Sequence, residues 1–305
     1  MTRLSRRRFI AMSAATIAAG RASAAGRETA YWRGQALGAR VQLALCGISQ
    51  AEAAPLFDGL ELELLRIESL FSLYRTDSAL ARLNRDQILR NPDPAMLHLL
   101  SQARAVFTAT EGAFDPTVQP LFDLHARAFA EGRRVGADEV QQVRRGVGFD
   151  HVSLSPQAIR FHRAGMALTL NGIAQGYATD RLATLLKSAG LRDILVNAGE
   201  IRALGDGQGQ GWTVSVPGGR ALTLKDQAIA TSDVSGTLVD PVAGIGHIFD
   251  PRGDAPPPSG PVSICHDSAA IADAASTAAV LMSSPERDLL RPLGAKIVGS
   301  AGIRS

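Results

Sequence analysis

The spacing of apolar residues divides the first third of the chain into a strand and two helices. From Arg40 to Leu45 apolar and polar residues alternate, as in a half-buried strand. The run Ser49–Glu52 is a capping box, and helical spacing of leucines continues from it to about Phe71. A second helix has Pro94 in its first turn and stops at Gly112.

The rest of the chain adds short strands and three more helices, and it contains no internal repeat. Helices and strands do not alternate regularly, so the pattern favours an α+β, or mixed α/β, fold over repeated βαβ units. The predicted strands cover 151–154, 158–162, 167–170, 193–197, 212–216, 228–231, 246–249 and 262–265, and the predicted helices cover 137–145, 173–189 and 269–283.

Residues 1–24 have the three parts of an export signal. The run Ser5–Ile10 matches the twin-arginine pattern, a mildly apolar stretch continues to Ala19, and the small-residue site Ala22–Ala24 follows. The apolar stretch is about half of the ~20 residues that span a bilayer. We therefore expect twin-arginine export to the periplasm, a mature domain over 25–305 and no stable membrane insertion. The alternative is an amphipathic helix belonging to the mature domain.

The basic character of the chain belongs to this signal. The whole sequence has a formal charge of +3. The signal holds five arginines and no acidic residue, which leaves 27 basic residues against 29 acidic ones, a formal charge of −2. No basic run with interleaved aromatic residues occurs in the remainder, so we expect no nucleic-acid partner.

Two cysteines, Cys46 and Cys265, lie in apolar, strand-like runs. An oxidising compartment would allow them to pair, but buried thiols without a disulfide are the commoner outcome in such runs. Two cysteines this far apart do not make a metal site.

The helix predicted near the C-terminus carries the first candidate for chemistry. Ser268 is placed to cap it, and Asp273 and Thr277 are four positions apart, so their side chains leave the same face. A carboxylate beside a hydroxyl offers two oxygen ligands to a hard cation such as Mg²⁺. The alternative is that Asp273 is an acid favoured by the helix dipole.

Two further segments join secondary-structure elements and could contact a ligand. The segment Thr169–Ala178 links a predicted strand to a helix, and its glycines and helix N-terminus suit an anion such as pyrophosphate; it could equally be a helix-entry turn. The segment Glu111–Val118 is a turn in which Phe114 could be core and Asp115 a cap. Neither HExxH nor GxSxG spacing occurs, which argues against zinc hydrolysis and a serine triad.

Seven segments, taken in order, resemble the signatures of the ApbE family of FAD:protein FMN transferases. The resemblance extends from about Leu37 to Leu281. Its segments are Phe71–Ser78 continued by Arg82–Asn84, Gly112–Thr117, Asn171–Asp180, Val196–Arg202, Ala228–Ser232, His247–Arg252 and Ala272–Ala278.

The resemblance implies a fold, a reaction and a site. The fold would be ApbE-like, with helices packed on mixed or antiparallel sheets and FAD in a cleft between two parts. The reaction would be Mg²⁺-dependent transfer of FMN from FAD to a threonine of an acceptor flavoprotein, with release of AMP. Asp273 and Thr277, with the carbonyl of Gly172, would bind the metal; Asp273 and His247 would be catalytic, His247 by positioning or polarising phosphate. The FAD-lining residues would be Leu37, Tyr74, Ala113, Phe114, Asp115, Thr169, Gln175 and Ile248.

The chain departs from the family pattern at several of these positions. Thr169 stands where many members have Asp, Gln175 where they have Lys or Glu, and Leu37 where Met is usual. Ser232 is followed by Asp233 instead of Gly, and Arg252 by Gly-Asp instead of Thr-Gly. The metal-ligand positions are intact, which favours retained catalysis.

Two alternative functions use the same sites. Water could replace the acceptor threonine, which would make the chain a FAD pyrophosphatase, or the chain could bind and deliver flavin without turnover. The amino-acid sequence of the third signature and the twin-arginine signal are also similar to those of the family branch called NosX. Its acceptor would be a NosR-like membrane flavoprotein.

Overall fold

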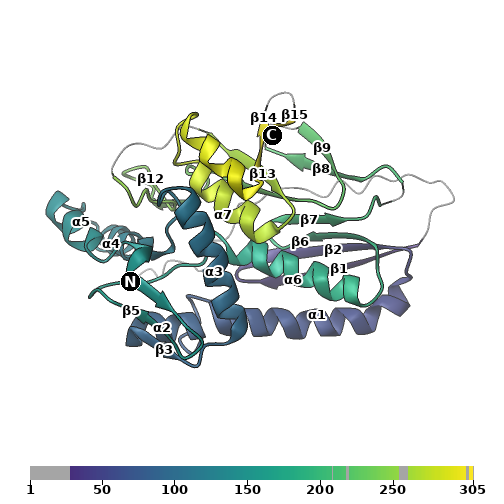
Figure 1. Ribbon diagram of the computed structural model, residues 1–305, viewed down its shortest axis with the longest axis horizontal. Helices are drawn as coiled ribbons and strands as arrows, with labels where there is room; N and C mark the ends of the chain where they lie inside the picture. Colours follow the sequence, from purple (N-terminus) through teal and green to yellow (C-terminus); the bar gives the residue numbers. More distant parts are fainter. Residues whose placement is uncertain (1–27, 208, 218–219, 254–259, 300–301, 305) are drawn as a thin grey trace.

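The computed structural model describes residues 28–207, 209–217, 220–253, 260–299 and 302–304 (Figure 1). The predicted signal over 1–24 lies outside these residues. Within them, no helix is long and apolar enough to cross a membrane.

An eight-stranded sheet forms the centre of the molecule, and every neighbouring pair of its strands is antiparallel. Some neighbouring strands are joined by short hairpins and others by long segments that contain helices, so strands far apart in sequence become neighbours in the sheet. In spatial order the strands are β1 (Thr29–Ala36), β2 (Ala39–Cys46), β6 (Asp193–Asn197), β7 (Ile201–Leu204), β10 (Ala228–Ser232), β13 (Val262–His266), β14 (Lys296–Gly299) and β15 (Gly302–Arg304).

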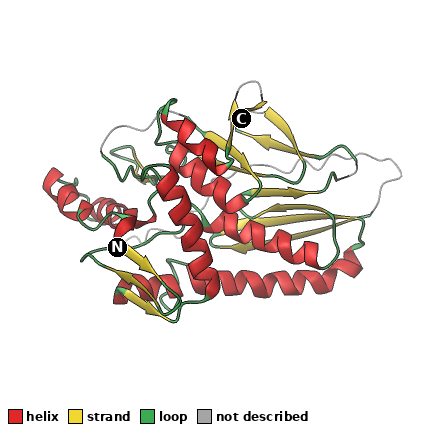
Figure 2. Ribbon diagram, in the orientation of Figure 1, coloured by secondary structure: helices red, strands yellow, loops and turns green. Residues whose placement is uncertain are grey.

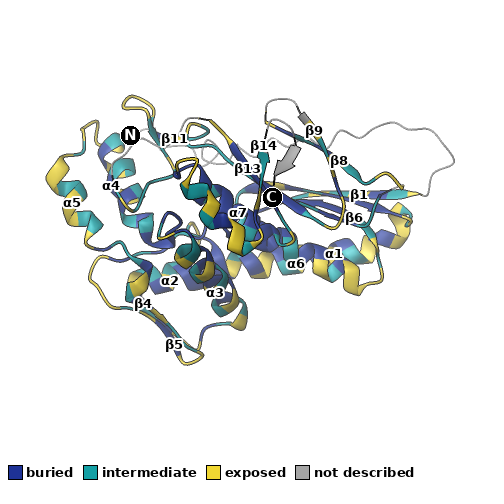
Figure 3. Cartoon of the chain, turned by 45° about the horizontal axis from the view of Figure 1, so that its top comes forward, coloured by how far each residue is buried: buried dark blue, intermediate teal, exposed yellow. Residues whose placement is uncertain are grey.

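Three helices lie on one side of this sheet, and a two-stranded hairpin packs on the other. The helices are α1 (Gln50–Phe71), α6 (Ala174–Ser188) and α7 (Ala269–Ala279) (Figures 1 and 2). Figure 3 shows the buried inner side and exposed outer side of α1. The hairpin, β8 (Trp212–Val216) with β9 (Arg220–Leu224), shares an apolar cluster with the opposite face of the sheet.

Smaller elements extend from the helical side of the sheet. A second sheet has the order β3-β5-β4 and lies near α2 and α3, whereas α4 and α5 project to one side with the β11–β12 hairpin near α4 (Figure 1). The bounds are α2 (Ala79–Asp86), β3 (Ile88–Arg90), α3 (Pro94–Ala109), α4 (Gln119–Ala130), α5 (Ala137–Arg144), β4 (Val152–Leu154), β5 (Ala158–Phe161), β11 (Leu238–Asp240) and β12 (Ile245–Gly246), with 3₁₀ turns over Pro116–Val118, Phe149–His151 and Glu286–Leu293.

The crossing of α6 and α7 is the tightest contact between the helices. A Cβ atom added to Gly176 would lie 2.2 Å from the carbonyl oxygen of Ala269, so only glycine fits there. The seven alanines of α7 are buried and keep its surface close to both α6 and the sheet. The two backbones therefore approach closely enough to exchange polar contacts.

Most predicted elements are confirmed. The Ser49 capping box opens α1, Pro94 lies in the first turn of α3, and the predicted helices over 137–145, 173–189 and 269–283 correspond to α5, α6 and a shorter α7. The α+β fold class is also confirmed. The capped helix α2 and the helix α4, together with β1, β3, β7, β9, β11, β14 and β15, were not predicted.

The strand predicted over 167–170 is wrong, because a side chain takes the place of a partner strand. Asn84 Oδ1 accepts a hydrogen bond from the backbone N–H of Leu168, and Asn84 Nδ2 donates to the Leu168 carbonyl, both at 2.8 Å. The segment therefore belongs to no sheet. The strand predicted over 246–249 shrinks to the two residues of β12.

Cys46 and Cys265 are both buried and do not form a disulfide, as expected. They lie on β2 and β13, with three strands between them. At about 4.8 Å per strand the separation is roughly 19 Å, far beyond the ~7 Å limit between the Cα atoms of a disulfide.

We predict that Gly176→Ala lowers the free energy of unfolding by about 2–3 kcal/mol, because the new methyl group must push α7 away from α6. Urea denaturation followed by circular dichroism measures the change. Gly59→Ala is the matched control: Gly59 lies within α1 and a Cβ there meets nothing within 4 Å, so it should stabilise the protein by about 0.5–1 kcal/mol. Equal stability of the Gly176 variant and the unchanged protein would contradict the close crossing.

We also expect Cys265 to be inert towards thiol reagents. Burial raises the pKa of its thiol to about 12, and Lys296 only partly opposes this, so the thiol stays protonated at pH 8. Mass spectrometry after treatment with iodoacetamide should find Cys265 unmodified in the folded protein and modified in urea. Rapid labelling of the folded protein would show that the strand is accessible.

Candidate functional site

One end of the large sheet collects the predicted site segments. Because neighbouring strands are antiparallel, the β1–β2 turn, the β6–β7 turn and the C-terminal end of β10 lie at the same end. The N-terminal end of α6 lies there too, since the side chain of Gln175 contacts Gly199 in the β6–β7 turn. Segments up to about 200 positions apart thus meet at this end.

Asp273 and Asp180 join α6 and α7 reciprocally. Oδ2 of Asp273, on α7, accepts a hydrogen bond of 3.1 Å from the backbone N–H of Gly176 in the first turn of α6. Asp180, on α6, accepts hydrogen bonds from the N–H groups of Ala269 and Ala270 and from the hydroxyl of Ser268, at 2.6–3.1 Å. Each carboxylate satisfies backbone donors that the other helix leaves open at its N-terminus.

The carboxylate of Asp273 is buried, and no basic side chain among the residues described pairs with it. Its side chain is only 4% exposed, and within the described residues Gly176 is the one donor to it. Burial raises the pKa of Asp273 well above its ordinary value, and the hydrogen bond from Gly176 opposes the shift only in part. Such a carboxylate gains strongly from a bound cation.

Thr277 lies one turn beyond Asp273 and faces Gly172. A Cβ atom at Gly172 would lie 2.9 Å from Thr277 Oγ1, so glycine leaves the backbone of residue 172 open towards this hydroxyl. Ser232, the last residue of β10, lies 3.4 Å from the same hydroxyl and 2.7 Å from Ser276 Oγ. The structure therefore brings together the three predicted metal ligands.

The donor set suits a hard cation. It consists of a carboxylate, a hydroxyl and a backbone carbonyl, all oxygen atoms, as Mg²⁺ prefers. In the described part of the chain no three His, Cys, Asp or Glu side chains cluster as a metal site. The three oxygen ligands of Asp273, Thr277 and Gly172 thus fit an ion that keeps water or substrate oxygens among its ligands.

Two other predicted residues are linked to the Gly172 loop. Tyr74, just after α1, is 58% exposed over the whole residue, and the hydrogen bond between its hydroxyl and the Asn171 side chain links it to this loop. The backbone N–H of Thr169 donates to the carbonyl of Pro116 at 2.8 Å. The loop 169–172 thus connects the turn after α3 to α7.

Ala113, Phe114 and Asp115 form that turn and are all buried. Asp115 Oδ1 accepts from the N–H and the hydroxyl of Thr117, and Oδ2 accepts from the N–H of Phe149. Burial raises the pKa of Asp115, and these hydrogen bonds oppose the shift. Its carboxylate holds two chain segments together, which is the capping role weighed from the sequence; a contact with FAD stays a prediction.

Leu37 and Gln175 lie at the same end of the sheet. Leu37 begins the two-residue β1–β2 turn with a φ of +47°, and its N–H donates to Glu68 on α1. Gln175 rests against Gly199, where an added Cβ would lie 2.6 Å from the amide oxygen of Gln175, so the absence of a side chain leaves room for the amide. Both remain predicted FAD contacts.

His247 and Ile248 follow the β11–β12 hairpin. Ile248 packs against the apolar cluster around Ala272 and Ala275 of α7. His247 Nδ1 lies 3.1 Å from the carbonyl of Thr237, so this nitrogen carries the proton and Nε2 is left as an acceptor. Desolvation by the surrounding protein lowers the pKa of His247, which favours the neutral ring at pH 7.

A clamp from α5 was not predicted from the sequence. Arg144, the last residue of α5, donates to the carbonyl oxygens of Asp250, Pro251 and Gly253 at 2.8–3.2 Å. The rings of Phe122 and His125 on α4 pack against Phe249. The loop carrying His247 and Ile248 is therefore held by the α4–α5 projection, and no local signal in the sequence marks so distant a pairing.

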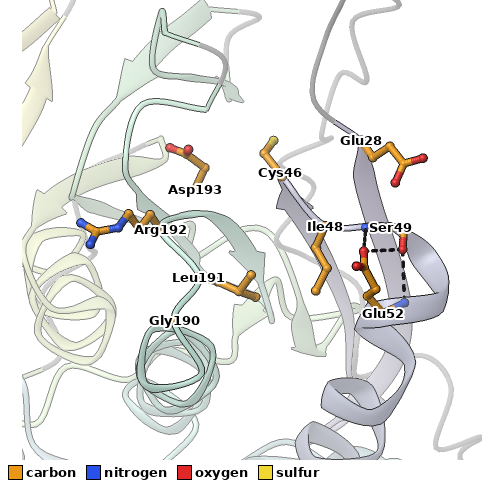
Figure 4. Close-up of a pocket in the computed structure, with 10 residues that line it drawn as sticks. Glu28, Cys46, Ile48, Ser49, Glu52, Gly190, Leu191, Arg192 and Asp193 are labelled. Carbon is orange, nitrogen blue, oxygen red and sulfur yellow. Dashed lines mark hydrogen bonds between the residues drawn. The ribbon is translucent and has the colours of Figure 1, made fainter.

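A pocket of about 440 Å³ lies away from the predicted metal ligands Gly172, Asp273 and Thr277 (Figure 4). It opens where β2 ends and α1 begins, and its other wall is the segment Gly190–Asp193 after α6. The fifteen residues of α6 separate it from Gly176 by roughly 20 Å at 1.5 Å per residue. It contains none of the predicted site residues.

Comparisons with known proteins agree with the site motifs. The sequence profile described as the ApbE family matches residues 37–295. A FAD:protein FMN transferase of Escherichia coli K12 is 27% identical over 222 residues, covering 68% of this chain and 62% of the relative. One from Rhodobacter capsulatus is 30% identical over 201 residues, covering 61% and 38%. The match thus spans less than two thirds of either relative.

Solved structures share the fold over nearly their whole length. The Flavin Transferase ApbE from Vibrio cholerae aligns with a TM-score of 0.74 at 22% identity, covering 91% of this chain and 96% of that chain. The apbe protein from Thermotoga maritima aligns with a TM-score of 0.76 at 26% identity, covering 90% and 96%.

We predict that Arg144→Gln loosens the loop that carries His247. Losing three charged hydrogen bonds to its backbone should accelerate amide hydrogen exchange at Phe249, Asp250 and Arg252 by about tenfold. Exchange followed by mass spectrometry reports this directly. Arg145→Gln, at the exposed neighbouring position, should leave the loop unchanged; similar exchange in both variants would show that Arg144 is not the clamp.

Proposed function

Because the chain belongs to the ApbE family, we propose that it is a FAD:protein FMN transferase. It would move FMN from FAD onto a threonine hydroxyl of an acceptor flavoprotein and release AMP. The observation that carries this proposal is the meeting of Gly172, Asp273 and Thr277 where α6 crosses α7.

These three residues would hold Mg²⁺. When bound, the ion would neutralise charge on the pyrophosphate of FAD and on the departing AMP. Asp273 would supply the negative charge, and Gly176 fixes its orientation through a backbone hydrogen bond. Since Asp273 is buried and no described basic side chain pairs with it, the ion would also relieve the cost of ionising it.

The transfer itself is a displacement at phosphorus. The oxygen of the acceptor threonine attacks the phosphorus of the FMN half, the bond to the bridging oxygen breaks, and AMP leaves with that bonding pair. The hydroxyl proton must be removed, and besides the predicted role of His247 in positioning or polarising phosphate, its Nε2 would be able to accept this proton, because the hydrogen bond to Thr237 is made by Nδ1. The lowered pKa of His247 favours the neutral ring, the form that can accept a proton.

We further propose that the enzyme works in the periplasm after twin-arginine export, with a NosR-like membrane flavoprotein as its acceptor. The run Ser5–Ile10 and the amino-acid sequence of Asn171–Asp180 support this proposal. Deleting the gene and finding the NosR-like protein still fully flavinylated would refute the choice of acceptor.

Mass spectrometry of an acceptor domain with a flavinylation-type threonine motif tests the transferase. Incubated with the protein, FAD and Mg²⁺, the acceptor should gain one FMN on threonine, and EDTA should abolish the gain. We predict that Asp273→Asn slows this transfer at least about a hundredfold, because the carboxylate charge at the metal is lost. Asp267→Asn, an exposed acid before α7, should have no effect.

The products separate the alternatives. Free FMN and AMP with an unmodified acceptor would indicate a FAD pyrophosphatase, and intact FAD would indicate a flavin carrier. Full transfer by the Asp273 variant would contradict the metal assignment.

A further inference from the structure

Ser232 lies next to the proposed metal ligands but is not one of them. It is the last residue of β10, and its side chain points to the side of the sheet covered by α7. Its hydroxyl oxygen is 2.7 Å from Ser276 Oγ and 3.4 Å from Thr277 Oγ1. Ser276 and Thr277 are adjacent on α7, so Ser232 contacts both from outside the helix.

The direction of each hydrogen bond in this group follows from the count of protons. Ser276 Oγ lies 2.9 Å from the carbonyl oxygen of Asp273, which can only accept, so Ser276 donates its single proton there. Ser232 must then donate to Ser276. With its own proton engaged, Ser232 can only accept from Thr277.

This order fixes what Thr277 presents to the metal site. A hydroxyl binds a cation through an oxygen lone pair, so its proton must point elsewhere. Directing that proton to Ser232 leaves both lone pairs of Thr277 Oγ1 free for a cation, and Gly172 lies close to the same oxygen.

We infer that Ser232 is a positioning residue for the cation site, accepting the proton of Thr277 and thereby orienting Thr277 as a neutral oxygen ligand. The inference rests on the proposed function for the identity of the metal. A cation drawing electron density from Thr277 makes its hydroxyl a stronger donor, so the 3.4 Å contact should shorten towards the 2.5–3.0 Å of a strong bond when metal is bound.

The chain supplies a matched control on the opposite face of the same two strands. Thr231 Oγ1 and Ser263 Oγ are also 2.7 Å apart, on the neighbouring position of β10 and its partner on β13. This pair faces the β8–β9 hairpin side, away from α7. Ser263→Ala therefore removes an equivalent hydroxyl contact without touching Thr277.

The test is the affinity for Mn²⁺, a paramagnetic substitute for Mg²⁺, with the free ion counted by electron paramagnetic resonance. The EDTA-stripped full chain is titrated in the presence of FAD. Ser232→Ala should raise the dissociation constant about tenfold, while Ser232→Thr, which keeps the hydroxyl, should stay within about threefold. Ser263→Ala should bind as tightly as the unchanged protein.

Thermal unfolding in EDTA shows whether a variant is folded before its affinity is read. If Ser232→Ala does not fold, Ser276→Ala is measured in its place. Removing the Ser276 hydroxyl frees the Ser232 proton to donate to Thr277 and compete with the cation, so Ser276→Ala should also bind Mn²⁺ more weakly. Unchanged affinity in Ser232→Ala, or an equal loss in Ser263→Ala, would overturn the inference while the metal site stands. Failure of the unchanged protein to bind Mn²⁺ would overturn the metal assignment, and this inference with it.

Discussion

The close approach of α6 to α7 is the contact on which the rest of the site depends. Gly176 permits it, since any side chain there would collide with the carbonyl of Ala269. At this distance Asp273 reaches the first turn of α6 and Asp180 caps α7, so each helix completes the hydrogen bonding of the other. Packing and electrostatics thus fix Asp273 in one position, and the buried carboxylate then favours a cation beside it.

The site combines this rigid crossing with loops that are fixed by single polar contacts. Asn84 holds the segment before Gly172 in place of a strand, and Asp115 ties the turn after α3 to residue 149. Arg144 holds the backbone of the loop after His247. Two of the three proposed metal ligands thereby lie on a helix, whereas most of the residues predicted to contact flavin lie on tethered loops, which would suit a site that admits both FAD and an acceptor protein.

The sequence predicted those features that depend on residues close together in the chain. The capping box at Ser49, the proline at the start of α3 and the four-residue spacing of Asp273 and Thr277 depend on near neighbours, and the structure confirms the first two and places the pair on one helix beside Gly172. The strand over 167–170 was wrong because its partner is a side chain 84 positions away. The clamp by Arg144 and the contact of Ser232 with Thr277 join residues 45 or more positions apart, and the sequence around each gives no sign of them.

The central claim is that the α6–α7 crossing forms a cation site for FAD chemistry. Crystals of the protein grown with FAD and Mn²⁺ test it most directly, through the anomalous scattering of the metal. The claim predicts a peak at coordination distance from the Asp273 carboxylate, the Thr277 hydroxyl and the Gly172 carbonyl, next to the pyrophosphate of FAD. A bound FAD whose pyrophosphate and metal lie elsewhere, with Asp273 still hydrogen-bonded only to Gly176, would contradict it.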